Sequence, residues 1–452
     1  MNTLKAGVAR ANITPPVGTA ANGATSPTGI ATELYAKALV FDDGHTKAAL
    51  VTADVLLLGR QVVAETRTRI EEMTGIPGAH VMFAASHTHS GAVTTMRGRW
   101  STVEHDKSYV DQLVAKMAGA VAEANLNRRE ARIGADEGRA DVSINRWIST
   151  PEGAKWAPNP EGPVDDTLSV LRVDHSDGQP IAALVDYAAH ASVMRWGKVF
   201  AADYPGFLQS VVEKVYDDRI TVLFANGASG DTKIKWLRKK EDGSDDFAYG
   251  GVEDARRWGT VLAGEAVKIL EQIRTEARDQ RPEDRDQRPE ARDQRPEIGK
   301  LRVASKEIAF PMLSLPTIEE IEAELKAKRE KGEDATWEER TLASLHAGNA
   351  PTAITGEIQI IRIGPDIILA AIPGELFAEV GLKMREQVAC KHLFIVGYAN
   401  GYVGYLPSAA SCREDGDKPR YDWHKFFWYP ANFSEEVEPN ILQAVRELVS
   451  VV

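Results

Sequence analysis

The sequence is poor in cysteine and in long apolar runs, and it carries no excess of positive charge. Cys390 and Cys412 are the only cysteines among 452 residues, which excludes a disulfide framework and fits a reducing, cytoplasmic location. No apolar run reaches the roughly 18 residues that a membrane-spanning helix needs. The formal net charge of −12 disfavours nucleic acid as a partner, because binding to phosphates requires a basic surface.

The N-terminus lacks the features of a signal peptide. Residues 1–7 contain no basic stretch followed by an apolar segment and run straight into a strand-like sequence. This second absence supports the expectation of a cytoplasmic protein.

What is present is the composition of a soluble globular chain, with 43% hydrophobic and 27% charged residues. Short strand-like runs alternate with amphipathic helical patterns, which predicts an α/β layered fold with a mixed β-sheet flanked by helices. We expect one large domain over residues 1–452. The expected strands are 34–41, 48–53, 81–85, 169–173, 181–187, 221–225, 357–363, 367–372 and 393–397, and the expected helices are 59–74, 105–125, 205–216, 253–275, 374–388 and 435–449.

Two segments interrupt this alternation. Residues 278–298 repeat Arg-Asp-Gln-Arg-Pro-Glu with one variable residue. The recurring proline with no apolar seam predicts a solvated linker at 276–298. Residues 317–347 read as two charged helices, which we interpret as an insertion.

Three histidines stand at the ends of strand-like runs. The apolar run 81–85 leads directly into Ser-His-Thr-His-Ser-Gly at 86–91, which places His87 and His89 on the same side of the chain. His190 ends another such run. Neutral imidazole is the commonest metal ligand in proteins and also a proton carrier near neutral pH. The pattern therefore indicates a metal-dependent hydrolase.

Catalytic zinc takes three protein ligands and keeps a position for water. His87 and His190 are the strongest candidates, and Glu375 is the third because it follows a buried strand-like run and opens a predicted helix. Strand ends are where an α/β sheet presents its active site. The alternatives are that the histidines are core residues and that Glu375 only places negative charge at a helix N-terminus. No His-Glu-x-x-His motif occurs, which excludes that class of metalloprotease.

Several segments in this order resemble the catalytic domain of the neutral, non-lysosomal ceramidases and their bacterial relatives. The resemblance extends over nearly the whole chain and is interrupted at 276–350. The segments are ARANITPP at 9–16, ASHTHSG at 85–91, INR at 144–146, NPEGPVD at 159–165, AADYPG at 201–206, NGASGD at 226–231, PGE at 373–375 and NGYVGY at 400–405.

The resemblance implies a zinc-dependent hydrolase of linear amides that takes part in sphingolipid metabolism. Its substrate would be a small N-acyl amide, with a lipid amide as the first expectation. His89 would carry the proton, and Arg146 would hold the substrate carbonyl or its oxyanion. One zinc ion per chain would be held by His87, His190, Glu375 and Tyr402, so that Tyr402 also belongs to the catalytic group.

Further polar residues lie near these segments in sequence. Asp54 and Asp203 end strand-like runs, where they either orient ligand histidines or cap loops. We expect Asn226 to Asp231 to form a tight turn that lines the site, and Tyr405 to be a core tyrosine with a hydrogen-bonded hydroxyl. An alternative for Arg146 is an ion pair with the acidic residues at 165–166.

An aromatic cluster near the C-terminus has no repeating pattern. It predicts a pocket wall or an oligomer contact, with core packing as the alternative. The cluster consists of Tyr421, Trp423, Phe426, Phe427, Trp428 and Tyr429, and Trp147 and Trp156 extend it.

The sequence departs from the ceramidases in three respects. Where they carry Gly-Asp-Val-Ser-Pro-Asn, residues 230–235 read Gly-Asp-Thr-Lys-Ile-Lys, without that serine. We also expect neither a C-terminal immunoglobulin-like domain nor a secretion signal. Two alternatives therefore stay open: the same fold and metal acting on a small polar amide, an ester or a sugar derivative, or a binding protein without catalysis.

Overall fold

Two β-sheets form the centre of the protein. The computed structural model describes residues 3–21, 27–95, 106–150, 153–194, 198–275, 300–412 and 423–452. The predicted linker at 276–298 and Tyr421 lie outside the described residues.

The larger sheet has eight strands and the smaller one four. Both are mixed, because β4–β5, β10–β12 and β18–β20 pair in parallel while the other neighbours are antiparallel. In spatial order the larger sheet contains β12 (Thr221–Asn226), β10 (Pro180–Tyr187), β9 (Thr167–His175), β6 (Arg129–Arg139), β1 (Lys5–Asn12), β3 (Tyr35–Asp42), β4 (Lys47–Ala53) and β5 (Val81–Ala85). The smaller sheet contains β16 (Leu301–Pro311), β17 (Ala353–Ile363), β18 (Ile367–Ala371) and β20 (His392–Val396).

The alternation of side chains along the strands explains how the layers pack. Leu39 and Phe41 of β3 join a core with Leu369 and Phe394 of the smaller sheet. Their neighbour Val40 points to the opposite face, where it packs in the core that includes α1 and α2. Both faces of this strand are therefore buried, one by the second sheet and one by helices.

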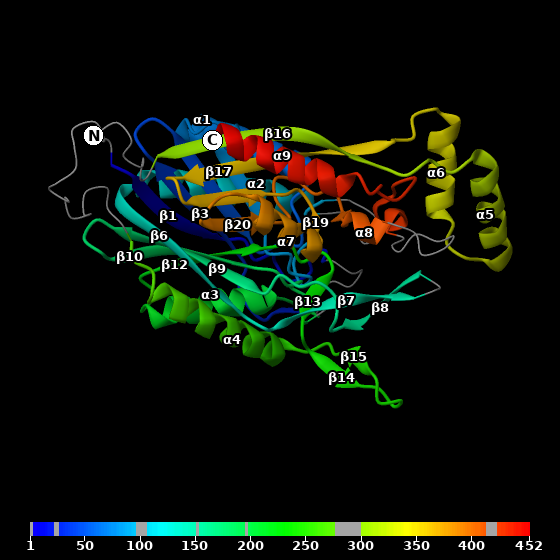
Figure 1. Ribbon diagram of the computed structural model, residues 1–452, viewed down its shortest axis with the longest axis horizontal. Helices are drawn as coiled ribbons and strands as arrows, with labels where there is room; N and C mark the ends of the chain where they lie inside the picture. Colours follow the sequence, from blue (N-terminus) through cyan, green and yellow to red (C-terminus); the bar gives the residue numbers. More distant parts are fainter. Residues whose placement is uncertain are drawn as a thin grey trace.

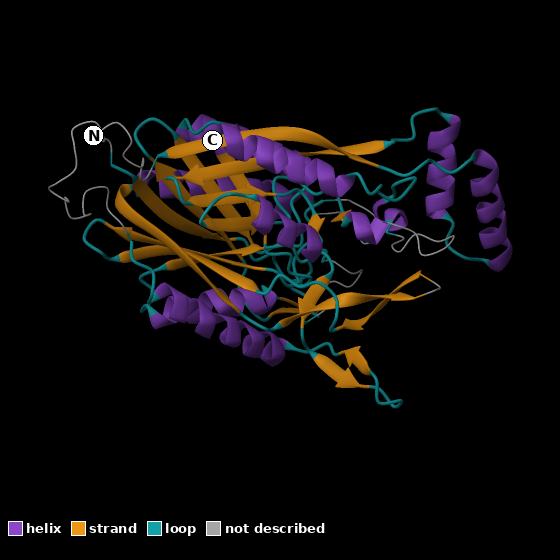
Figure 2. Cartoon of the chain, viewed as in Figure 1, coloured by secondary structure: helices purple, strands orange, loops and turns teal. Residues whose placement is uncertain are grey.

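Helices cover the outer faces of the two sheets (Figures 1 and 2). On the larger sheet these are α1 (Arg60–Thr74), α2 (Lys107–Leu126), α3 (Asp203–Val215) and α4 (Val252–Leu270). On the smaller sheet they are α7 (Ala378–Gln387) and α9 (Val437–Val451). No helix in the described ranges is long and apolar enough to cross a membrane.

Shorter elements surround one end of the sheets, and a helical arm extends from it. The arm is formed by α5 (Ile318–Lys331) and α6 (Thr336–His346), which confirms the two charged helices predicted at 317–347 (Figure 1). The remaining elements are β2 (Gly29–Ile30), β7 (Ser143–Thr150), β8 (Gly153–Asn159), β11 (Val199–Phe200), β13 (Thr232–Ile234), β14 (Leu237–Lys239), β15 (Asp245–Phe247), β19 (Glu375–Leu376), β21 (Tyr405–Leu406), α8 (Ala409–Cys412) and the 3₁₀ turns Gly78–His80 and His424–Phe427.

The predicted α/β class with a mixed sheet flanked by helices is confirmed, and one boundary near the site is corrected. Glu375 does not open a helix: it pairs in parallel with Tyr405 in β19–β21, and α7 begins only at Ala378. Its backbone N–H is taken up by the carbonyl of Gly404 at 2.9 Å, which continues sheet pairing past Gly374. The proposal that its charge merely stabilises a helix N-terminus is therefore wrong.

The carboxyl ends of strands from both sheets meet at one edge. Gly397, after β20, donates its N–H to the carbonyl of Asn226 at the end of β12, at 2.9 Å. Asn400 donates to the carbonyl of Phe83 in β5 at 3.1 Å. These bonds join the loops of the two sheets, so residues far apart in sequence are brought to a common place.

A buried carboxyl group at this junction makes stability depend on pH. Asp186 of β10 accepts the backbone N–H of Ile395 at 2.8 Å, and burial raises its pKa to about 8. Between its ordinary value of 3.8 and about 8, the folded protein holds a proton that the unfolded chain has lost. The free energy of unfolding should therefore fall as pH rises, by up to ~1.4 kcal/mol per pH unit.

We predict that Asp186→Asn removes this contribution to the pH dependence of the unfolding free energy, because an amide needs no proton to remain neutral. Urea denaturation from about pH 5 to about pH 8 measures it. The matched control is Asp177→Asn in the exposed β9–β10 turn, which should leave the slope as in the wild type. An unchanged slope in Asp186→Asn would contradict the assignment of the proton to this carboxyl.

Candidate metal centre

Loops from both sheets bring two histidines and a glutamate together. His87 follows β5, His190 follows β10, and Glu375 follows β18. The Nε2 atoms of the two histidines are 3.1 Å apart, and Glu375 Oε2 lies 3.2 Å from His190 Nε2 and 3.6 Å from His87 Nε2. All three residues are buried, with at most 3% of their surface exposed.

The outer nitrogen of each imidazole faces a backbone carbonyl. His87 Nδ1 lies 2.7 Å from the carbonyl oxygen of Leu56, and His190 Nδ1 lies 2.9 Å from that of Ser229. A carbonyl oxygen can only accept a hydrogen bond, so we infer that each Nδ1 carries the proton. The two Nε2 lone pairs then point toward each other, which is the orientation of metal-ligating histidines.

Glu375 completes the arrangement. The hydroxyl of Tyr402 donates to its Oε1, whereas its Oε2 has no hydrogen-bond partner among the described residues. Three lone pairs thus converge at a site closed to bulk water. The three donor atoms repel one another unless a cation lies between them. The donor set of two imidazoles and a carboxylate suits a divalent transition metal.

His89 lies at the same place. Ligand atoms of His87, His89 and His190 all lie within 4.8 Å of one another, so this histidine group could also hold a metal ion. The sequence assigned His89 to proton transfer and not to ligation. Its position is compatible with both roles, and its role stays a prediction.

Burial controls the protonation of the group. It lowers the pKa of His87 to about 3 and the pKa values of His89 and His190 well below the usual range, with Arg146 adding to the effect on all three. The imidazoles are therefore neutral near pH 7, which is the form that binds metal. Burial also raises the pKa of Glu375 to about 7, and a bound cation would favour its charged form.

Strained backbone marks the loops that carry these groups. His87 has a φ of 62°, Tyr398 of 52° and Asn400 of 50°, all in the left-handed region that non-glycine residues rarely adopt. Such strain is typical of functional sites, where the surrounding structure holds it. Asn400 supplies part of that support by accepting the N–H of Phe83 at 2.9 Å and donating to Gln359 at 2.8 Å.

Tyr398 is a residue of the site that the sequence analysis missed. Its ring stacks on His87 with centroids 4.1 Å apart and planes 25° apart, and its hydroxyl is 2.8 Å from Ser229 Oγ. The available signal was its place directly after the buried strand β20, the same kind of position as that of His190. It keeps the His87 ring from rotating out of its orientation.

Arg146 of β7 lies beside the histidines in a buried position. Its Nη2 donates to the carbonyl of Gly230 at 2.6 Å and to the hydroxyl of Tyr405 at 3.0 Å, while its Nε has no hydrogen-bond partner among the described residues. The alternative of an ion pair with residues 165–166 is wrong. Arg385 pairs with Asp165 and Arg139 pairs with Asp166, both at 2.8 Å.

The comparisons with known proteins identify the family of the chain. The model of the family "Neutral/alkaline non-lysosomal ceramidase, N-terminal" matches residues 5–233, about half of the chain. The chain belongs to this ceramidase family. It is 24% identical over 193 residues to neutral ceramidase B of Dictyostelium discoideum, a match that covers 40% of this chain but 26% of that relative.

Two solved ceramidase structures have the same fold. Neutral ceramidase from Pseudomonas aeruginosa superposes with a TM-score of 0.71 at 18% identity, over 99% of this chain and 74% of that chain. A structure described as a ceramidase complexed with C2 gives a TM-score of 0.71 at 16% identity, over 99% of this chain and 75% of that one.

Asp54 and Asp203 of this ceramidase-family chain form no hydrogen bond with the candidate ligand histidines, although that was one of the two roles considered for them. The carbonyls of Leu56 and Ser229 take the position foreseen for Asp54 and Asp203. Asp54 instead accepts the N–H of Tyr35 at 3.0 Å. Asp203 accepts three N–H groups, those of Tyr204 at 2.7 Å, Met194 at 3.0 Å and Val193 at 3.4 Å, and so fixes the loop that follows His190. Both aspartates cap loops because desolvated carboxylates require donors, which peptide groups supply here.

The predicted turn from Asn226 to Asp231 connects β12 to β13 beside the ligands. Asn226 Nδ2 donates to the carbonyl of Ser86 at 3.3 Å. Asp231 accepts from Asn145 Nδ2 at 2.9 Å and from the N–H of Ala378 at 2.7 Å, and burial raises its pKa to about 6. The turn therefore joins β7 to the start of α7 and holds the loop that carries Glu375.

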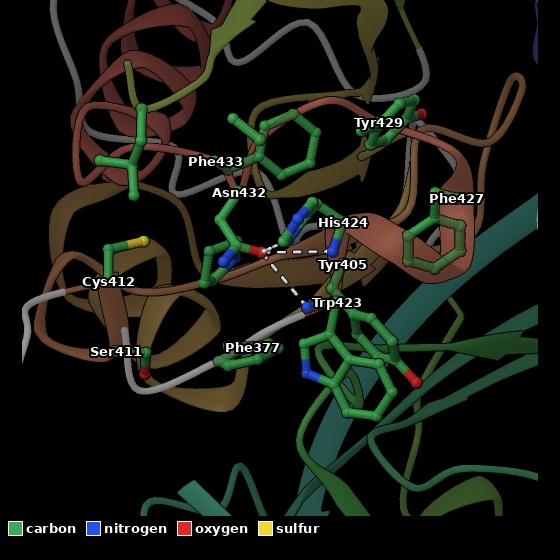
Figure 3. Close-up of a pocket in the computed structure, with 13 residues that line it drawn as sticks. Phe377, Tyr405, Ser411, Cys412, Trp423, His424, Phe427, Tyr429, Asn432 and Phe433 are labelled. Atoms are coloured by element: carbon green, nitrogen blue, oxygen red, sulfur yellow. Dashed lines mark hydrogen bonds between the residues drawn. The ribbon is translucent and has the colours of Figure 1, made fainter. Parts of the chain in front are cut away.

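Aromatic residues line a pocket next to Arg146 (Figure 3). Trp423 lies 4.7 Å from the ring of Tyr405 and 5.0 Å from that of Trp147, between ring centroids. Asn432 Oδ1 accepts the N–H groups of Trp423 and His424, each at 3.2 Å, which fixes one wall. The pocket-wall prediction is thus confirmed for Trp423, Phe427 and Tyr429.

We predict that Gly230→Ala displaces Glu375 and impairs metal binding. A Cβ at residue 230 would lie 2.2 Å from the carbonyl oxygen of Glu375, a backbone atom that cannot move aside alone. We expect a loss of about 1–3 kcal/mol in unfolding free energy and a lower metal content, measured by urea denaturation and elemental analysis.

The matched control is Gly119→Ala in α2, where a Cβ meets nothing within 4 Å. This variant should be more stable by about 0.5–1 kcal/mol and keep its metal. If Gly230→Ala resembled Gly119→Ala, the close approach to Glu375 would not matter for the site.

Proposed function

We propose that this protein is a zinc-dependent hydrolase of linear N-acyl amides, with a lipid amide of the ceramide type as the first substrate to test. The observation that carries the proposal is the convergence of the His87, His190 and Glu375 lone pairs in a buried site of a ceramidase-family chain. In this proposal Tyr402 is the fourth residue at the metal. Its hydroxyl, which donates a hydrogen bond to Glu375 Oε1, would be the ligand group.

Zinc bound at such a site lowers the pKa of a water ligand to about 7 and polarises a carbonyl. The chain's own residues supply the rest of the reaction. Tyr398 and the carbonyls of Leu56 and Ser229 keep the two imidazoles oriented, which avoids reorganisation during the reaction.

In this proposal Arg146 stabilises negative charge on the amide oxygen. Its Nη2 donates to Gly230 and Tyr405, and its buried Nε–H has no hydrogen-bond partner among the described residues, so that Nε–H is one donor available to a substrate. A fixed donor in a site closed to bulk water stabilises a developing oxyanion strongly. The same hydrogen bonds keep the guanidinium from turning away.

In this proposal His89 moves the proton. Burial, with a smaller contribution from the cations Arg146 and Lys233, keeps its pKa well below the usual range, so it is neutral near pH 7, where one ring nitrogen carries no proton and can receive one. The imidazolium that results is unstable in these surroundings, which favours rapid transfer to the departing amine nitrogen.

The aromatic pocket supports an apolar acyl chain as part of the substrate. Its lining includes Tyr405, whose hydroxyl accepts a hydrogen bond from Arg146, and the aromatic side chains of Phe377, Trp423 and Phe427 (Figure 3). Such surface favours apolar groups through the area that they remove from water.

We predict about one zinc ion per chain in the wild type and almost none in His87→Ala, because a single imidazole with Glu375 and the Tyr402 hydroxyl holds the ion poorly. Elemental analysis after purification without chelator measures both. The matched control is His80→Ala, whose ring lies in another part of the chain against the carbonyl of Lys47. A wild type that takes up no zinc when zinc is supplied would overturn the proposal.

We predict that Arg146→Lys lowers kcat by about 100- to 1,000-fold with little change in KM, since a lysine keeps the charge but lacks the guanidinium fork. Steady-state hydrolysis of an N-acyl amide measures both constants. Arg139→Lys, an exposed arginine paired with Asp166, is the control and should have no effect. An unchanged kcat in Arg146→Lys would exclude the role given to Arg146.

A further inference from the structure

The helical arm is inserted into a β-hairpin of the smaller sheet. β16 and β17 pair in antiparallel register as far as Pro311 and Ala353, and the N–H of Met312 donates to the carbonyl of Thr352 at 2.9 Å. The chain therefore leaves and re-enters the sheet at adjacent points, with α5 and α6 in between (Figure 1). Two residues are enough to connect paired antiparallel strands, so the arm is an addition to a hairpin that is complete without it.

The arm contacts the turn His424–Phe427 through Trp337 of α6. Trp337 is 6% exposed, and its Nε1 donates to the carbonyl of Tyr429, just after the turn, at 2.8 Å. Its ring centroid is 5.1 Å from that of His424, and the ammonium of Lys425 lies 4.3 Å from its ring centre. A single side chain of the arm thus contacts three residues in this short stretch of chain.

Charged residues of both arm helices add to this contact. Lys425 Nζ lies 3.0 Å from Glu324 Oε2 of α5 and 3.8 Å from Glu338 Oε1 of α6. Glu338 is fully buried, and a buried carboxylate requires a cation close by. Arg340 of α6 lies 5.2 Å from the ring centre of Trp428. Both helices therefore hold the same turn and the residues that follow it.

The same turn forms a wall of the aromatic pocket. His424, Phe427 and Tyr429 line the pocket together with Trp423 (Figure 3). Trp428, between two of these residues, has a φ of 58°, in the left-handed region that is unfavourable for a bulky side chain. Such a conformation persists only where surrounding contacts hold it, and the arm supplies contacts on both sides of it.

We propose that Trp337 positions this wall and thereby determines how tightly the protein binds a long acyl chain. Trp337 contacts two lining residues, His424 and Tyr429, and acts on the substrate through them. A wall that is already ordered binds an apolar chain more tightly than one that must be ordered on binding. This inference rests on the proposed hydrolase function and specifies what sets its acyl-chain preference. Trp337 is therefore a positioning residue.

The test compares N-octanoylethanolamine with N-acetylethanolamine, which carry the same amine and differ only in the length of the acyl chain. Trp337→Phe keeps an aromatic ring beside His424 and Lys425 but lacks the N–H donor. We expect KM for the octanoyl amide to rise by about 2- to 10-fold at unchanged kcat, the range for one lost hydrogen bond. Both constants for the acetyl amide should stay as in the wild type, because two carbons bury little surface in the pocket.

Trp337→Ala removes the ring as well and should raise KM for the octanoyl amide by at least about tenfold. The matched control is Trp258→Phe in α4, where the indole Nε1 has no hydrogen-bond partner among the described residues. It should behave as the wild type does. An unchanged octanoyl KM in the Trp337 variants, or an equal loss for both amides, would overturn the inference. If Trp337→Ala does not fold, Trp337→Phe alone decides.

Calorimetric binding of N-octanoylethanolamine separates the inference from the proposed function. If the zinc-loaded wild type hydrolyses neither amide, the hydrolase proposal fails and binding alone decides about Trp337. A dissociation constant that rises by at least about twofold in Trp337→Phe and stays unchanged in Trp258→Phe would support the role of the arm. No binding to the wild type, or equal binding to the wild type and Trp337→Phe, would reject it.

Discussion

The Nε2 atoms of His87 and His190 lie 3.1 Å apart, and each carries a lone pair because its Nδ1 faces a carbonyl oxygen. This contact is unfavourable by itself, and much of the surrounding structure serves to maintain it. The stacking of Tyr398, the left-handed backbone at His87 and the close approach of Gly230 to Glu375 all hold the donors in place. A cation between the donors turns this repulsion into ligation.

The two-sheet architecture determines where that contact can form. Each sheet ends in short loops at the same edge, and backbone hydrogen bonds such as Gly397 to Asn226 join the loops. His87 and His190 follow strands of the larger sheet, whereas Glu375, at the start of β19, and Tyr398 follow strands of the smaller one. The site therefore depends on the packing of the two sheets, and each sheet supplies only part of the donor set.

The sequence predicted the buried strands that lead to the site, because such strands have strong apolar patterns, but it did not predict β6, β7, β8 or β16. It placed β5 and β20 within one residue of their observed ends and brought forward His87, His190 and Glu375. It did not show that a second sheet covers one face of the first, since a strand buried between two sheets has the same apolar pattern as one buried under helices. It also could not assign the Nδ1 partners, because backbone carbonyls leave no trace in residue identity. Of the two roles considered for Asp54 and Asp203, the structure supports loop capping and not contact with the histidines.

The distribution of ligands over two sheets has a thermodynamic consequence. An ion held by His87, His190 and Glu375 cross-links the sheets, and its binding free energy adds to the cohesion of the apolar interface between them. The affinity of the site for the ion and the free energy of packing between the two sheets are then coupled. A substitution that weakens packing between the sheets would lower the affinity for the ion, and removal of the ion would lower the stability of the interface between the sheets.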